Sequence, residues 1–361
     1  MLARRSIINH PHAGEIELPL LVPAFSSKGF RLKQTRHARV VHDFSEVSYE
    51  LKDFGNRHSA SVMVSAYDLH FRHFDAPELG SAKLETYLRN SGLVFLDSGG
   101  YELVPDIDSS GPKAYAYTPK TGFGPGEYEI VLRRLTSLSK ALPLVIANFD
   151  HTPRKEPLNS QIKSARALFR KFPDCMSDFI LKPWTPQGRI IEPSQLTEVD
   201  FANLRGFDII GVTEKELGRD IFDRFKRIAK LRRGLDDAKF SGPIHIWGGL
   251  DPIMTPLYFF AGAEIFDGVS WLRYAFHDGI AINRECYAVV SPIGVTATGS
   301  LNHAYASLEN LTALNNITIA LQQWVDFEGK KFDMFHPIVR DHLKRAYSVM
   351  VSKIRKINGG I

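Results

Sequence analysis

The chain of 361 residues is 44% hydrophobic and 24% charged, which is enough apolar sequence to bury a full core and excludes a disordered or fibrous protein. Its formal net charge of +5 is a mild excess that suits an anionic partner such as nucleic acid without requiring one. Two cysteines, Cys175 and Cys286, are too few for a disulfide framework and too far apart for a Cys-x-x-Cys metal site, which favours a reducing compartment. No apolar run approaches the roughly 18 residues of a membrane span. No signal-peptide core follows the first residues either, so we predict a cytoplasmic protein with no membrane association.

Short apolar runs recur along the chain, with segments of crossover length between them. The runs cover residues 18–24, 61–67, 93–97, 144–150, 178–184, 208–213, 244–249 and 264–270. Runs this short, bounded by turn residues, are typical of strands buried on both faces. Helix-period spacing or a proline start is found between them over residues 128–142, 161–172, 222–233 and 252–262. Eight strands alternating with helices predict an α/β fold, a (β/α)8 TIM barrel that forms a catalytic domain over residues 1–286.

From about residue 287 the alternation of strands and helices ends. A helix-like stretch covers residues 304–325, and a basic one covers residues 337–356. We therefore expect residues 287–361 to form a helical C-terminal appendage packed on the barrel. Within the barrel, residues 105–126 are rich in glycine, proline, serine and aspartate, which predicts a mobile loop over the mouth.

Three acids lie at or near the ends of predicted strands: Asp97, Asp150 and Asp267. Because a (β/α)8 barrel carries its active site at the C-terminal ends of its strands, we expect these carboxylates to converge on one mouth. Such a cluster can supply a nucleophile, a general acid/base or an acceptor for a polar ring, although each acid alone could also cap a helix or pair with an arginine. After Asp97, Ser98 and two glycines form a turn that lets the backbone approach a ligand closely, and Tyr101 adds a flat apolar ring.

Histidines near these acids raise metal ligation as an alternative. His151 follows Asp150, and His70 and His73 lie in the loop after the second predicted strand. The first predicted strand has no His-x-His pair and no third histidine ends a strand, so we expect neither a catalytic metal nor another cofactor. His245 lies inside an apolar run and is interpreted as a core histidine.

Two stretches resemble the signature regions of the guanine transglycosylases, which exchange a guanine in tRNA for a 7-deazaguanine. They are DSGGYEL at residues 97–103 and GGLDPIMTPLYFFAGAEIFDGVSWLRYA at residues 248–275. The opening stretch at residues 14–30, GEIELPLLVPAFSSKGF, is similar to the first strand and loop of that family. The likeness runs in order over about residues 12–325 and implies a base-exchange enzyme acting on tRNA or DNA, with a homodimer suggested by relatives.

The resemblance implies a role for each strand-end acid. Asp267 matches the nucleophile, which attacks the anomeric carbon of the ribose, expels guanine and forms a covalent aspartyl–ribosyl intermediate. Asp97 matches the acid/base that handles protons on the leaving and incoming bases. This division is physically reasonable, because the attacking carboxylate must stay ionised while a neighbouring acid shares and returns a proton.

The resemblance also implies contacts to the flipped-out base. Asp150 matches the acid that accepts hydrogen bonds from the ring amide and the exocyclic amine. Ser98 and the backbone of Gly211 match further base contacts, and Tyr101 matches the aromatic that stacks on the base. Lys182 stands roughly where the family carries a glutamine.

The chain departs from the family pattern in two places. The family carries a Cys-x-Cys-x-x-Cys…His zinc site after the barrel, whereas here Cys286 stands alone and residues 309–311 read Glu-Asn-Leu in place of His-Asn-Leu. We predict that structural zinc is lost and that the apolar residues 287–295 fill its space. In the base pocket, Glu102 replaces a glutamine and Val212 replaces a glycine, which leaves the identity of the incoming base open.

Basic side chains on two predicted helices and after the last strand are candidates for binding phosphates. In the barrel they are Arg224, Lys226, Arg227, Lys230, Arg232, Arg233 and Arg273. In the last helix they are Arg340, Lys344, Arg345, Lys353, Arg355 and Lys356. The alternative for either helix is a solvated basic face with no ligand.

Two classes of function fit these observations. The first is an enzyme that exchanges a guanine in tRNA or DNA for a free purine or 7-deazapurine base. The second is a catalytically silent relative that binds nucleic acid or a partner subunit. The presence of Asp97, Asp150 and Asp267 together favours the enzyme, because a silent subunit has no need of a nucleophile. A hydrolase that cleaves an N-glycosidic bond on the same barrel is the alternative among enzymes.

Overall fold

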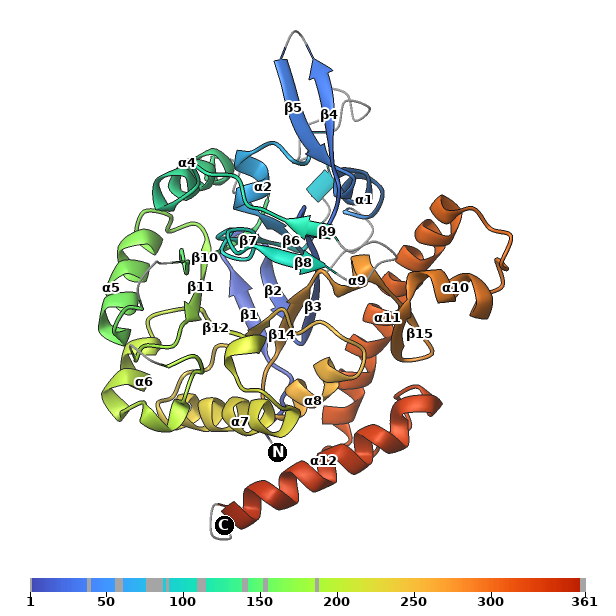
Figure 1. The fold of residues 1–361 in the computed structure, drawn as a ribbon. Coiled ribbons are helices and arrows are strands. Elements are labelled where there is room, and N and C mark those ends of the chain that lie inside the picture. The colour runs from blue at the N-terminus through green and yellow to red at the C-terminus, as the bar shows by residue number, and fades with distance from the viewer. Residues whose placement is uncertain are drawn as a thin grey trace.

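A closed barrel of eight parallel strands, following one another in chain order, forms the centre of the molecule (Figure 1). The computed structural model describes residues 2–37, 40–55, 61–75, 87–88, 91–108, 115–137, 142–151, 155–185 and 188–357. The barrel strands are β3 (Leu20–Phe25), β6 (Ser61–Ser65), β7 (Leu93–Asp97), β10 (Leu144–Ala147), β11 (Met176–Leu181), β12 (Ile209–Thr213), β13 (Ile244–Trp247) and β14 (Ile265–Gly268). Each strand overlaps one of the predicted apolar runs, so the predicted (β/α)8 barrel is confirmed.

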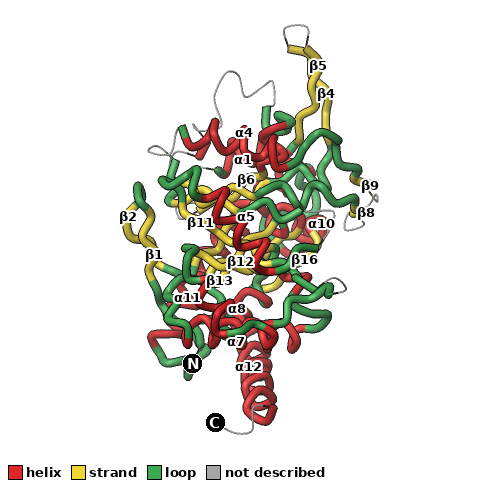
Figure 2. The backbone as a smooth tube through the Cα atoms, turned by 90° about the vertical axis from the view of Figure 1, so that its left-hand side faces the viewer, coloured by secondary structure: helices red, strands yellow, loops and turns green. Residues whose placement is uncertain are grey.

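Helices follow the strands and lie on the outer side of the barrel (Figures 1 and 2). They are α1 (Val47–Phe54), α2 (Ala66–His70), α4 (Pro125–Thr136), α5 (Leu158–Phe169), α6 (Glu198–Leu204), α7 (Ile221–Asp237), α8 (Met254–Phe260) and α9 (Ser270–Arg273). α4 starts before its predicted position, because a proline suits the first turn of a helix. The apolar pattern does not predict α6, which begins with a capping box between Thr197 and Asp200.

Side chains of the barrel strands alternate between the barrel interior and the layer under the helices. In β7, Leu93 and Phe95 belong to the interior cluster, whereas Val94 and Leu96 pack under the helices. The same alternation places Asp97 in the interior at the end of the strand. On other strands, the alternation places four further polar or small residues in the barrel interior. They are Asp178, Gly211, His245 and Asp267.

A hairpin covers the N-terminal end of the barrel. It is formed by β1 (Ile7–His10) and β2 (Gly14–Glu17). Ile8 joins the interior cluster, and His10 Nε2 forms a 3.0 Å hydrogen bond with the carbonyl of Leu144, where β10 begins. The polar interior residues therefore face the opposite, C-terminal mouth.

Two antiparallel strand pairs follow barrel strands on the mouth side. β4 (Leu32–His37) and β5 (Val40–Ser45) form a pair that projects from the barrel (Figure 1). β8 (Asp106–Asp108) pairs with β9 (Tyr115–Tyr117) within the segment predicted as a mobile loop. That segment therefore contains regular structure, and its residues 109–114 lie outside the described part of the chain.

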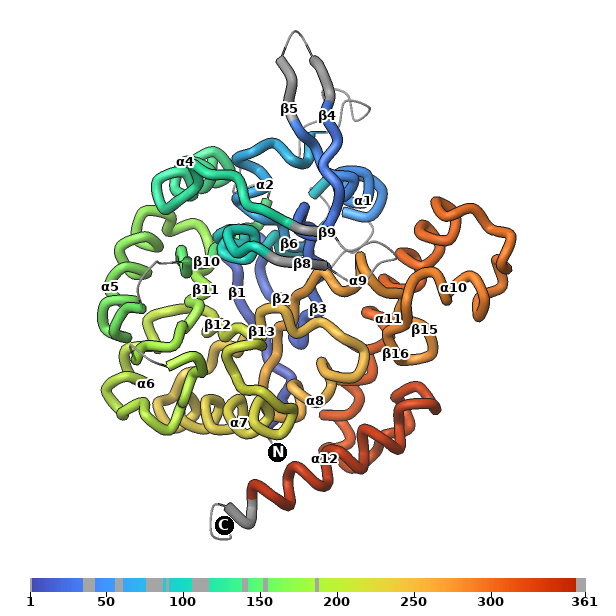
Figure 3. The backbone as a smooth tube through the Cα atoms, in the orientation of Figure 1, coloured from blue at the N-terminus to red at the C-terminus, as the bar shows by residue number. Residues whose placement is uncertain are grey.

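The C-terminal appendage follows the barrel on its outer side (Figure 3). Its elements are β15 (Tyr274–His277), β16 (Ile280–Asn283), α10 (Arg284–Val290), α11 (Gly299–Asp326) and α12 (Pro337–Ile357). The strand pair β15–β16 and the start of α10 precede residue 287, where the appendage was predicted to begin. Both predicted C-terminal helices are confirmed. Trp324 of α11 packs against Phe260 of α8, with ring centroids 4.1 Å apart, and joins the appendage to the barrel. None of the helices in the described ranges is both long and apolar enough to cross a membrane.

The apolar stretch at residues 287–295 does not fill a buried space, so that prediction is wrong. Tyr287 is buried, but Val289, Val290 and Val295 are 69%, 52% and 72% exposed. α10 contacts α11, β15 and β16, while Val289 and Val290 at its C-terminal end are exposed.

Candidate active site

The three predicted acids come together at the C-terminal mouth of the barrel. Asp97 ends β7, Asp267 lies in β14, and Asp150 follows β10 by three residues. Burial raises the pKa of Asp97 well above its usual value, and the charges of Glu102, Asp150 and Asp267 raise it further. Asp97 therefore holds a proton more tightly than an ordinary aspartate, as a general acid must.

Asp267 is almost completely buried, and its two oxygens have different surroundings. The backbone N–H of Gly248 donates a 2.9 Å hydrogen bond to Asp267 Oδ1. His245 Nε2 lies 3.2 Å from the same oxygen. Among the described residues, none bonds to Oδ2 of Asp267. That oxygen keeps its lone pairs for a ligand.

Asp150 is held by Ser98 and Lys182. Ser98 Oγ donates a 2.6 Å hydrogen bond to Asp150 Oδ1, and Lys182 Nζ lies 3.3 Å from Oδ2. A Cβ at Gly100 would lie 2.5 Å from Asp150 Oδ1, so any larger residue there would displace this carboxylate. Lys182 also pairs with Glu216 at 2.9 Å, so it bridges two acids. Burial lowers the pKa of Lys182, but these two acids raise it more, and the side chain remains a cation.

Two cations lie beside Tyr101. Lys28 Nζ donates a 2.8 Å hydrogen bond to the Tyr101 carbonyl and lies 4.1 Å from the centre of its ring. Arg273 donates to the Tyr101 hydroxyl at 3.2 Å and to the Lys28 carbonyl at 3.0 Å. Arg273, predicted to bind phosphate, thus contacts the residue predicted to stack on the base. Lys28 was not predicted, because nothing in the sequence indicates that it meets a residue so distant in the chain.

Glu102 is a fourth acid at this mouth, and it is fully buried. It accepts hydrogen bonds from Ser26 Oγ at 2.5 Å and from Ser65 Oγ at 2.8 Å. Burial and the charge of Asp68 raise its pKa to about 7. The carboxyl group is therefore partly protonated at neutral pH.

Gly211 lies in the middle of β12 rather than in a loop. A Cβ there would lie 2.7 Å from Asp178 Oδ1 and would clash with Trp247 Nε1. The absent side chain thus leaves room for an indole and a carboxylate in the barrel interior. Val212 points the other way, into the core under the helices.

His245, interpreted from sequence as a core histidine, bridges two acids on other strands. Its Nδ1 lies 2.6 Å from Asp178 Oδ2, and its Nε2 lies 3.2 Å from Asp267 Oδ1. A signal for this position exists in the sequence. The two-residue period of β13 places His245 inside the barrel together with Trp247, two residues before the strand ends.

The histidines considered as metal ligands have other contacts or are exposed. His70 packs against the rings of Phe71 and Phe123, and His151 is exposed. His73 is buried and pairs with Asp68 at 2.9 Å. In the part of the chain that the structure describes, no three or more His, Cys, Asp or Glu side chains are grouped to hold a metal ion.

The residues near the family's zinc position do not fit a thiolate-rich zinc site. Cys286 is exposed, and Glu309 pairs with His277 Nδ1 at 2.7 Å. Asn310 is buried, where it donates to the Tyr274 carbonyl at 2.8 Å and accepts from the Phe276 N–H at 2.5 Å. These polar contacts connect α11 to β15.

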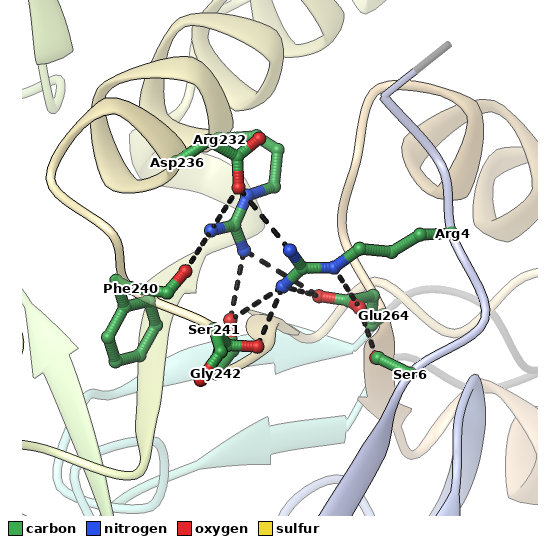
Figure 4. Close-up of polar contacts among 8 residues, drawn as sticks. All are labelled: Arg4, Ser6, Arg232, Asp236, Phe240, Ser241, Gly242 and Glu264. Atoms are coloured by element: carbon green, nitrogen blue, oxygen red, sulfur yellow. Dashed lines mark hydrogen bonds and ion pairs between the residues drawn. The ribbon is translucent and has the colours of Figure 1, made fainter.

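Arg232 is fully buried at the N-terminal end of the barrel (Figure 4). It donates to the carbonyls of Phe240 at 2.8 Å and Gly242 at 2.9 Å, and it lies 3.7 Å from Glu264. Arg4 pairs with the same glutamate at 2.9 Å. Because an enclosed guanidinium cannot reach a phosphate, the predicted role of Arg232 in nucleic-acid binding is wrong.

The other basic residues of α7 vary in exposure. Three have acidic partners: Arg224 pairs with Glu214, Lys226 with Asp223 and Arg227 with Glu192. Lys230 is half-buried, and Arg233 is exposed.

The structure brings the start of α7 next to α12. A groove of about 740 Å³ lies between α7, α8 and α12, and its basic lining includes Arg219, Arg224, Arg345 and Lys353. Lys344 is exposed, and Arg340 lies 3.8 Å from Asp333. The side chains of residues 355–356 lie outside the described part.

Comparison with known proteins adds no assignment, because no family model and no curated protein sequence matches the chain.

Proposed function

We propose that the chain is a guanine transglycosylase, which exchanges a guanine in tRNA or DNA for a free purine or 7-deazapurine base. The observation that carries the proposal is the convergence of Asp97, Asp150 and Asp267 on one barrel mouth in different environments. Burial and like charges keep a proton on Asp97. Asp267 instead faces donors through one oxygen and leaves the other open. A proton-holding acid beside an available carboxylate is the pair that double displacement at a sugar needs.

In the proposed reaction, Oδ2 of Asp267 attacks the anomeric carbon of the target nucleotide. The bond from that carbon to guanine breaks, the electron pair stays with the base, and Asp97 gives its proton to the departing guanine. A ring nitrogen of the incoming base then attacks the same carbon and displaces Asp267 as a carboxylate. The incoming base returns its proton to Asp97, so both acids end in their starting states.

Asp150 and Tyr101 are suited to hold the base during this exchange. The carboxylate of Asp150 has acceptor capacity left after its contacts with Ser98 and Lys182, which suits a ring N–H and an exocyclic amine. Tyr101 offers a flat aromatic ring on which a base would stack, and Lys28 lies 4.1 Å from the centre of that ring. Basic side chains that line the mostly apolar groove beside α12 offer contacts for the polynucleotide backbone.

The test is incorporation of radiolabelled guanine into bulk tRNA or duplex DNA, measured by acid precipitation. Asp267→Asn has nearly the same shape but cannot form the ester, so we expect exchange to fall by about 10³-fold or more while nucleic-acid binding persists. Asp251→Asn is the matched control. Asp251 accepts from the backbone N–H groups of Ile253 and Met254 at the start of α8, and asparagine keeps that acceptor.

Other outcomes separate the alternatives. A complex of protein and polynucleotide that resists denaturation, formed by the wild type with a poor acceptor base and absent in Asp267→Asn, supports the covalent intermediate. Asp97→Asn keeps the nucleophile, so we expect it to impair turnover and to favour this trapped species. Guanine released without incorporation of label indicates a hydrolase. Exchange that persists in Asp267→Asn overturns the proposed role of Asp267.

A further inference from the structure

We propose that His245 is a positioning residue that lies between Asp178 and Asp267, places a positive charge beside one oxygen of Asp267 and directs the other oxygen to the sugar. This inference rests on the function proposed above. It adds two residues, His245 and Asp178, that the sequence pattern does not connect with the reaction.

The geometry encloses the imidazole between acids from two other strands. Asp178 comes from β11 and Asp267 from β14, at 2.6 and 3.2 Å from the two ring nitrogens. The side chains of His245, Asp178 and Asp267 are only 0%, 1% and 8% exposed. The rings of Phe95 and Trp247 lie against the imidazole, with centroids 5.5 and 4.5 Å away. Charges in such a dry environment interact more strongly than charges in water.

The charge state of His245 follows from its neighbours. Burial alone lowers its pKa, but the carboxylates of Asp178 and Asp267 raise the pKa to about 9. Burial raises the pKa of Asp178, and the imidazole opposes that shift. Two other strands approach the imidazole of His245. Gly211 of β12 is the strand partner of His245, and Phe95 of β7 packs against its ring. Asp97, at the end of β7, interacts with Asp267. At neutral pH His245 is therefore a cation with an acid on each side.

The cation and one backbone N–H approach the same oxygen of Asp267. Gly248 N–H donates to Oδ1 in a good hydrogen bond, which fixes the orientation of the carboxylate. The approach of His245 Nε2 is a contact between charges rather than an aligned hydrogen bond. Its effect is therefore to stabilise the negative charge at Oδ1, while none of the described residues bonds to Oδ2. Preorganised charge of this kind acts without any rearrangement during the reaction.

Removal of the imidazolium has a defined pH signature. In His245→Gln the carboxylate of Asp267 loses its positive neighbour at every pH. We expect kcat at neutral pH to fall at least about tenfold, and the alkaline limb near pH 9, where His245 loses its proton in the wild type, to disappear. KM for guanine should change by less than about threefold, because His245 does not contact the base in this arrangement. His73→Gln is the matched control, since His73 is also buried and paired with an aspartate, Asp68, but is remote from Asp267 in its contacts.

A second variant keeps the inference testable if His245→Gln does not fold. Asp178→Asn leaves both other residues in place but removes the charge that raises the imidazole pKa. NMR of isotope-labelled histidine should show His245 titrating near pH 9 in the wild type and at least about one unit lower in Asp178→Asn. The alkaline limb of the kcat profile should move down in this variant, because His245 loses its proton at a lower pH.

The two proposals fail in different ways. If the wild type exchanges guanine but neither variant changes the pH profile, or His73→Gln changes it equally, the role of His245 is overturned and the proposed function stands. If His245 titrates near its ordinary pKa in the wild type, the proposed positive charge of His245 at neutral pH is overturned, whatever the activity. If the wild type exchanges no guanine, the proposed function fails, and the role of His245 in positioning a nucleophile fails with it.

Discussion

Glu102 is one of four carboxyl groups at the barrel mouth, and its buried surroundings change its pKa. It is enclosed with Ser26 and Ser65, and burial together with Asp68 raises its pKa to about 7. A carboxyl group that keeps its proton near neutral pH can donate as well as accept a hydrogen bond. It can then do what a glutamine amide would do at the same place.

Glu102→Gln should change how stability depends on pH. Because the pKa is raised on folding, the native state holds the proton between about pH 4.5 and 7 while the unfolded state has lost it, so the wild type loses stability as the pH rises through this window. The glutamine cannot ionise and escapes this loss. We expect the free energy of unfolding of the variant, relative to wild type, to be higher at pH 8 than at pH 5 by about 1–3 kcal/mol. Urea unfolding at both pH values measures the difference.

Glu129→Gln is the control for that experiment. The pKa of Glu129 is lowered by Lys171 and Arg133, so its ionisation favours the folded state and the variant should gain nothing at high pH. An equal stability difference between Glu102→Gln and wild type at pH 5 and pH 8 would mean that Glu102 keeps an ordinary pKa.

Within the single helix α7, basic residues near the start and near the end have different surroundings and different roles. Near its start, Arg224 pairs with Glu214 and lines the groove shared with α12. Near its end, Arg232 is buried among carbonyls and Glu264, while the adjacent Arg233 is exposed. A count of basic residues along the helix cannot separate these roles, because successive side chains on a helix point in different directions.

Arg232→Ala and Arg233→Ala form a matched pair that tests this distinction. Loss of Arg232 leaves buried carbonyls and Glu264 with fewer partners, so we expect about 3–5 kcal/mol of destabilisation. Loss of exposed Arg233 should cost no more than about 0.5 kcal/mol. Chemical denaturation measures both values. At a temperature where both variants are folded, the affinity of Arg232→Ala for a polynucleotide should depend on salt as that of the wild type does. A weaker salt dependence would mean that Arg232 binds a phosphate after all.

Across the whole molecule, the barrel and the appendage share one hydrophobic core. Trp324 of α11 is fully buried. Its ring packs against Phe260 of the barrel, against Tyr347 of α12 and against Phe332 in the segment that connects α11 to α12. A cluster contributed by three helices and a connecting segment cannot form before all of them are in place. The two parts should therefore unfold together.

Trp324→Ala should weaken the entire fold rather than release the appendage alone. We expect the free energy of unfolding to fall by about 3–5 kcal/mol in a single transition, followed by far-UV circular dichroism and tryptophan fluorescence together. Ile319→Ala on the same helix is the control, because Ile319 is 51% exposed and its loss should cost no more than about 0.5 kcal/mol. Two separated transitions in the wild type would show that the appendage folds independently.

The sequence by itself determined the eight strands, the two C-terminal helices and the three acids at the mouth. These features are local: a short apolar run, a turn of glycines and an acid at a strand end can all be read within ten residues. Only the tertiary structure decided which distant side chains meet. His245 contacts Asp178 and Asp267 because barrel closure places β11, β13 and β14 around one interior. The burial of Arg232 depends likewise on Glu264 and on the carbonyls before β13. Local patterns specify which way a side chain points, but its pKa and its partners depend on neighbours that only the folded chain brings together.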